Sequence, residues 1–158
     1  MPKTATNNFN KLLSRLKTDF PQFNFQANQE FHWSPTERTI FFNQNEVHAA
    51  DLLLHELAHA VLGHDGYNYD AELIKKELAA WQYSQTNFYP QYKTKFNQAL
   101  ADEYLDYYRN WLYERSLCPN CGLTGQQTTQ GHYTCLTCQN RWQPNPAKQT
   151  ALRRRQIK

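Results

Sequence analysis

Two histidines and a glutamate in the run His55-Glu56-Leu57-Ala58-His59 have the residue types and the spacing of a zinc site. Side chains four residues apart on a helix point the same way, so two imidazoles can bind one zinc ion while Glu56 projects beside them. Zinc lowers the pKa of a bound water to about 7, and a neighbouring carboxylate can move that water's proton to a leaving amine. The pattern predicts amide hydrolysis with Glu56 as the catalytic residue. The alternative interpretation is two ordinary helical histidines.

A catalytic zinc ion usually has three protein ligands, so a third ligand is expected downstream of His59. The long metzincin pattern would need Gly at position 62 and His at position 65, where this chain has Leu62 and Asp65. The next predicted helix offers two acids instead, Glu72 and Glu77.

The helical positions of these two acids favour Glu77. At 100° per residue, Glu77 falls inside the apolar face of the predicted helix and Glu72 falls on the opposite side. A carboxylate on a core-facing stripe is costly unless it is paired or bound to metal. We therefore predict Glu77 as the third ligand; a half-buried acid paired with a lysine or a tyrosine hydroxyl is the alternative. The apolar face is defined by Leu73, Ile74, Leu78 and Trp81.

Four cysteines predict a second zinc ion. They form two Cys-x-x-Cys pairs separated by 13 residues, a spacing that allows a β-hairpin to bring four thiolates to one tetrahedral ion. A redox motif would need only one pair near a thioredoxin-like fold, which the sequence does not suggest. The predicted ligands of this structural zinc are Cys118, Cys121, Cys135 and Cys138.

Candidates for stabilising a developing oxyanion lie just after the histidine pair. His64, Tyr67 and Tyr69 follow it on a polar connection and could donate a hydrogen bond. Packing is the alternative role for the tyrosines, and helix capping for His64. Asp51, one turn before His55, could orient a ligand imidazole or could be a solvated helix acid.

The remaining pattern predicts an α+β fold that positions these groups. A first helix is expected from the candidate caps Asn7 and Asn8 to about residue 18, followed by a small, antiparallel sheet from segments 23–26, 30–33 and 39–42. The histidine helix should span 47–62 and end at Gly63. Two more helices are expected, one over 71–86 and one that begins at Pro90 and carries Tyr92, Phe96, Leu100, Tyr104, Tyr107, Tyr108 and Trp111.

Charge and composition divide the chain into a body, a ribbon and a tail. Residues 1–114 carry 10 Lys and Arg against 14 Asp and Glu, whereas residues 115–158 carry 7 against none. We expect a zincin-like domain over 1–116, a zinc ribbon over 117–143 and a flexible basic tail over 144–158. Nucleic-acid binding is predicted for this end, with Tyr133 and Trp142 either stacking on bases or packing against the cysteines. The basic residues of the tail are Lys148, Arg153, Arg154, Arg155 and Lys158.

The run from Leu53 to Gly63-His64, followed by Glu77-Leu78-Ala79-Ala80, resembles the ImmA/IrrE family of metallopeptidases, small gluzincin-like enzymes often encoded on mobile elements. The resemblance covers roughly residues 40–85. It implies His55 and His59 as ligands, Glu56 as catalytic acid and base, a downstream glutamate as third ligand, and repressor-like DNA-binding proteins as substrates. The SprT-like family is a second resemblance, because it joins such a domain to a C-terminal zinc ribbon and acts on proteins attached to DNA. Its third ligand is usually a histidine, and no suitable histidine follows His64.

These features predict a cytoplasmic zinc metalloendopeptidase with two zinc ions per chain. The N-terminus has no export-like apolar run, no segment approaches the ~20 apolar residues that cross a bilayer, and paired cysteines suit a reducing compartment. The expected partners are a protein substrate, such as a DNA-binding protein, and DNA itself through the basic tail, with no membrane. A non-catalytic nucleic-acid-binding accessory protein and a secreted toxin-like protease are the alternatives.

Overall fold

The computed structural model describes residues 3–146 and 152–157 and has an α+β fold. The chain forms two compact units, one from Met1–Asp65 with Lys76–Gln98 and the other from Gly66–Lys75 with Ala99–Lys158. Helix α3 therefore contributes residues to both units. Within the described residues, no helix has the length and apolar character needed to span a bilayer.

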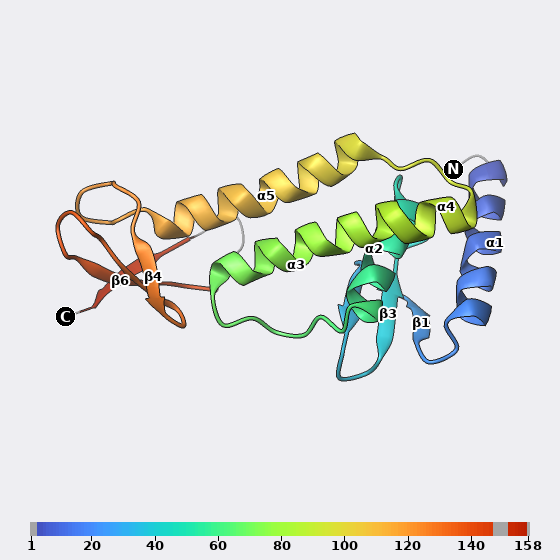
Figure 1. Ribbon diagram of the computed structural model, residues 1–158, viewed down its shortest axis with the longest axis horizontal. Helices are drawn as coiled ribbons and strands as arrows, with labels where there is room; N and C mark the ends of the chain where they lie inside the picture. Colours follow the sequence, from blue (N-terminus) through green and yellow to red (C-terminus); the bar gives the residue numbers. More distant parts are fainter. Residues whose placement is uncertain (1–2, 147–151, 158) are drawn as a thin grey trace. The chain divides into compact units, whose positions relative to one another are not determined.

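The first unit contains a three-stranded sheet of order β1-β3-β2. Strands β1 and β3 are labelled in Figure 1. The expected antiparallel sheet is only partly right, since β2 pairs antiparallel with β3 but β1 pairs parallel with it. The predicted strand over 39–42 is present as β3, and all four of its residues are buried. Such a strand is central and needs a partner on each side, which leaves β2 at one edge. The strands are β1 (Asn24–Ala27), β2 (His32–Ser34) and β3 (Thr39–Phe42).

Helix α1 (Lys3–Asp19) packs its apolar face into the core of the first unit. Phe9, Leu12 and Leu16 are buried there, as their helical spacing predicts. The predicted start is wrong, because the helical backbone already continues through residues 3–8. Asn7 and Asn8 therefore lie inside the helix and do not cap it.

Helix α2 (Ala49–Val61) carries the histidine pair and packs against β2 and β3 (Figure 1). It ends in a Schellman motif, in which the Gly63 N–H donates to Ala60 O at 3.2 Å and the His64 N–H to His59 O at 3.0 Å. Gly63 has φ +66°, a left-handed conformation that glycine adopts at little cost. This turn brings His64 back toward the last turn of its own helix.

One helical run continues from α3 (Asp70–Tyr83) through a π-helical turn η1 (Ser84–Phe88) into α4 (Tyr89–Tyr92). The prediction that Pro90 begins a long helix is therefore wrong. Proline cannot donate the i→i−4 hydrogen bond of an α-helix, and the π turn lies directly before it. The run ends at Lys93, which has φ +54°, and α5 (Gln98–Ser116) begins five residues later.

In the second unit, α5 leads into a four-stranded antiparallel sheet of order β4-β5-β6-β7. Tyr133 and Trp142 are 2% and 0% exposed and their rings stack at 5.6 Å, so they pack inside the ribbon and cannot stack on bases. Gly125 lies where a Cβ would come within 2.3 Å of the Trp142 ring and 2.7 Å of Thr134 O, which leaves no room for a side chain. The strands are β4 (Gln126–Thr129), β5 (His132–Thr134), β6 (Arg141–Pro144) and β7 (Arg154–Ile157).

Four residues of the segment expected to be a flexible basic tail form strand β7. Strand β7 pairs in register with β6, from Arg141 opposite Ile157 to Pro144 opposite Arg154. Strand β6 would otherwise present a row of unpaired backbone groups at the sheet edge, and β7 satisfies them. Lys148 and Lys158 lie outside the described residues.

Candidate metal centres

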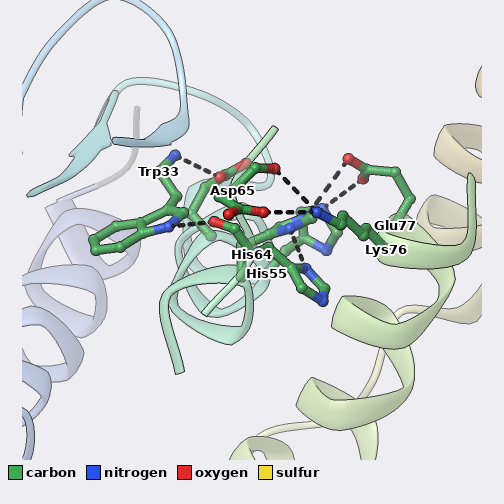
Figure 2. Close-up of polar contacts among 8 residues, drawn as sticks. Trp33, His55, His64, Asp65, Lys76 and Glu77 are labelled. Atoms are coloured by element: carbon green, nitrogen blue, oxygen red, sulfur yellow. Dashed lines mark hydrogen bonds and ion pairs between the residues drawn. The ribbon is translucent and has the colours of Figure 1, made fainter. Parts of the chain in front are cut away.

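The first candidate metal centre is formed by His55 and His59 of α2 and Glu77 of α3. Their ligand atoms converge: His55 Nε2 lies 3.0 Å from Glu77 Oε2 and 3.1 Å from His59 Nε2, and His59 Nε2 lies 3.5 Å from Glu77 Oε1. Figure 2 shows Glu77 directed at His55 from the neighbouring helix. The three residues predicted as ligands are therefore brought together.

These separations fit a tetrahedral zinc site. Ligand atoms about 2.0–2.1 Å from zinc at tetrahedral angles are about 3.3 Å apart, which lies within the observed range of 3.0 to 3.5 Å. His55, His59 and Glu77 are 2%, 9% and 6% exposed, and a buried acid facing two imidazoles is a donor set suited to a divalent ion. The residues present fit the metal that the sequence predicts.

The fold fixes each ligand through local structure. The i and i+4 spacing on α2 places the two imidazoles on one side of that helix, and the His55 ring stacks on Trp81 of α3 at 4.2 Å. The buried face of α3 is not quite the predicted one, because Leu78 is 37% exposed. It comprises instead Glu77, Ala80, Trp81 and, in the π turn, Ser84.

Glu77 and His59 shift each other's pKa values. Burial raises the pKa of Glu77, but hydrogen bonds from His55 and His59 outweigh burial and lower that pKa to about 2. Burial lowers the pKa of His59, but the hydrogen bond and charge of Glu77 outweigh it and raise that pKa above its ordinary value. The Glu77 carboxylate is thus ionised and available as a ligand.

His64 contacts the outer side of this centre. Its Nδ1 lies 2.8 Å from Nδ1 of His59, the ring nitrogen that faces away from Glu77. Its backbone carbonyl accepts a hydrogen bond from Trp33 Nε1 at 2.9 Å (Figure 2), and burial next to His59 lowers the pKa of His64 to about 4. This geometry suits His64 to orient the His59 imidazole. Its oxyanion role stays a prediction.

Glu56 lies on the same helix as the two histidines and is held by the sheet. Its Oε2 accepts a hydrogen bond from the Trp33 N–H of edge strand β2 at 2.8 Å. The sequence gives no signal for this contact, because it joins residues 23 positions apart through backbone atoms. The carboxylate is therefore fixed beside both the candidate metal centre and an edge strand.

The other residues predicted around the site have different surroundings. Asp51 accepts a hydrogen bond from the Tyr89 hydroxyl at 2.5 Å, so it serves the packing of α2. Tyr67 and Tyr69 belong to the second unit, where the Tyr67 ring packs edge-on against Trp111. Their oxyanion role stays a prediction. Asp65 forms an ion pair with Lys76 at 3.0 Å (Figure 2).

The second candidate metal centre is formed by the four cysteines. The Sγ atoms of Cys118 and Cys138 are 3.6 Å apart, as are those of Cys121 and Cys135. Zinc–sulfur bonds of about 2.3 Å at tetrahedral angles place sulfur atoms about 3.8 Å apart, so this group also fits zinc. The Cys138 N–H, 3.5 Å from Cys135 Sγ, lowers the pKa of the Cys135 thiol and thereby favours a thiolate.

A buried polar cluster in the second unit was not predicted. The Asp70 carboxylate accepts hydrogen bonds from Arg115 Nε at 2.8 Å and from the Tyr133 hydroxyl at 2.6 Å, while the Asp70 N–H donates to Gln127 Oε1 at 2.7 Å. This polar cluster links the start of α3 and the end of α5 to the ribbon. The sequence gives no local signal for this cluster, because Arg115 and Tyr133 are 45 and 63 residues from Asp70.

Comparison with known proteins found no matching family model, no matching curated protein and no matching solved structure.

Proposed function

We propose that the chain is a zinc-dependent peptidase whose active site is the centre formed by His55, His59 and Glu77. The observation that supports this proposal is the convergence of three buried side chains whose ligand atoms lie 3.0–3.5 Å apart, with the Glu56 carboxylate on the helix that carries the two histidines. An accessory protein that used this helix only for structure could employ Glu56 solely to accept the Trp33 N–H, so zinc-dependent cleavage is the result that separates the two functions.

His55, His59 and Glu77 would hold the zinc ion, which would supply a Lewis acid for the scissile carbonyl and the attacking water. Glu56 accepts the proton of the attacking water and later delivers it to the leaving amine. The Trp33 N–H orients the Glu56 carboxylate, and His64 orients the His59 imidazole through the Nδ1 contact. Each of these functions belongs to a residue whose position is fixed by hydrogen bonds.

The substrate is an extended peptide segment. Strand β2 is an edge strand, and the Trp33 N–H on its outer side reaches Glu56 rather than β3. A peptide that adds to this edge by backbone hydrogen bonds would lie beside the Glu56 carboxylate. By the resemblance to ImmA/IrrE, and to SprT-like proteins, the natural substrate is a DNA-associated protein such as a repressor.

The test is whether the purified full chain cleaves an unfolded protein in a zinc-dependent way. Reduced casein should yield new peptide termini, detected by mass spectrometry, and dialysis against a zinc chelator should abolish them. Returning zinc to the dialysed protein should restore cleavage. Cleavage that survives complete removal of zinc would contradict the proposal.

A further inference from the structure

The outward face of the ribbon sheet carries arginines without acidic partners. Register places Gln143 opposite Arg155 on the neighbouring strand, and Arg141 is the diagonal neighbour of Arg155 on the same face. Arg153 precedes β7, and its backbone N–H donates to Asn145 Oδ1 at 2.9 Å. We call Arg141, Gln143, Arg153 and Arg155, all of which are exposed, the basic face.

Arg154 lies outside this face although it is flanked by two of its arginines. Strand alternation turns it to the side of Pro144, its cross-strand partner. Its Nη1 donates to the carbonyls of Glu114 and Leu117, both at 3.2 Å, near the C-terminus of α5. Arg154 therefore satisfies carbonyls at a helix end, a structural role favoured by the helix dipole.

The charges of the basic face are not neutralised within the ribbon. Residues 115–158 contain no Asp or Glu, and within the described residues no ion pair involves Arg141, Arg153 or Arg155. Four thiolates on one zinc ion would contribute −2 against seven Lys and Arg, which leaves about +5. Diagonal cross-strand neighbours are only about 7–8 Å apart, so adjacent arginines repel one another until an anion binds between them.

We infer that the basic face binds the phosphodiester backbone of nucleic acid, independently of the proposed peptidase activity. Consecutive phosphates offer a row of anions to a row of guanidinium groups, and Gln143 adds a neutral donor. Tyr133 and Trp142 are both buried, so neither ring is available on this face for base stacking. Binding is therefore tolerant of sequence and strongly dependent on salt.

Fluorescence anisotropy of the full chain with a labelled mixed-sequence duplex and with the matching single strand tests this inference. Three phosphate contacts predict a slope of log affinity against log salt of about −2.7 for the duplex and about −2.1 for the single strand. Between 50 and 200 mM salt the affinity should fall about 40-fold and about 20-fold, respectively. The duplex should therefore give the steeper slope and the single strand the shallower one.

Arg→Gln substitutions each remove one positive charge from a chosen position. They locate the interface better than truncation after Gln143, because truncation would also remove β7. Arg155→Gln should reduce the slope by about 0.9 for the duplex, and Arg141→Gln with Arg153→Gln and Arg155→Gln should nearly abolish it. Arg154→Gln should leave the slope unchanged. So should Arg109→Gln, which removes one positive charge from an ion pair with Asp106 on α5.

Three results would overturn the inference. The first is a triple variant that binds like the unaltered chain, and the second is an equal loss of slope in Arg109→Gln and Arg155→Gln. The third is binding to neither nucleic acid at 50 mM salt, including the case in which the chain is retained only by vesicles of anionic phospholipid. None of these readouts depends on hydrolysis, so failure here is distinct from failure of the peptidase proposal.

Discussion

Glu77→Ala should lose the metal of the histidine centre and keep that of the cysteine centre. It removes one of three ligand atoms and leaves two buried imidazoles without their anionic partner. Groups that only support metal ligands already contribute about 10–100-fold to affinity, so loss of a ligand should exceed that range. Elemental analysis after gel filtration should give one zinc per chain instead of two.

Glu72→Ala is the matched control for this substitution, because it removes the same side chain from the same helix. Glu72 accepts hydrogen bonds from the backbone N–H groups of Asn68 and Tyr69 at 2.9 and 3.4 Å, which supports the start of α3. Its loss should lower the free energy of unfolding by about 0.5–2 kcal/mol, as for other helix caps, and leave two zinc ions bound. Loss of zinc from Glu72→Ala, with retention by Glu77→Ala, would refute the ligand assignment.

Cys118→Ser combined with Cys121→Ser should unfold the ribbon. Its hydrophobic cluster consists of Tyr133 and Trp142 with the buried Cys118 and Cys135, packed against the partly buried Leu112 and Cys138, too few residues to fold without metal. Structural zinc contributes about 10–16 kcal/mol of apparent binding free energy to domains of this size. Zinc content should fall from two to one, and trypsin should cleave after Arg141, which lies in a paired strand when the ribbon is folded.

Thr137→Ser is the control for the ribbon, because it changes a residue between Cys135 and Cys138, in the other knuckle, without removing a thiolate. This variant should retain two zinc ions and resist trypsin as the unaltered chain does. A double cysteine variant that also retained two zinc ions and remained resistant would show that the four cysteines do not hold a metal.

The composition of both metal centres could be predicted because their signals are local. The i and i+4 histidines and the two Cys-x-x-Cys pairs bring ligands together within one helix or one knuckle, whatever the rest of the chain does. The prediction of Glu77 required, in addition, only the orientation of one further helix. That argument selected the residue that lies beside the two histidines in the structure although the buried stripe differs, because Glu77 and Trp81 lie on both the predicted and the observed face.

Non-local pairing could not be predicted in the same way. The parallel pairing of β1 with β3 and the addition of β7 to β6 depend on which strand edges are left open, and alternation within a strand does not report this. The Glu56 contact with Trp33 and the Asp70 cluster also join distant residues. The continuous helix through Pro90 depends on a π turn for which the sequence gives no signal.

The central claim is that Glu56 acts as a general base beside a zinc ion held by His55, His59 and Glu77. Its most direct test is the initial rate of peptide hydrolysis by Glu56→Gln and by the unaltered chain, with zinc content measured on the same samples. Glutamine keeps the size of the side chain but cannot accept the proton, so the rate should fall by roughly 10²–10⁴-fold while both proteins retain two zinc ions. An unchanged rate, or a single zinc ion in the unaltered chain, would contradict this account.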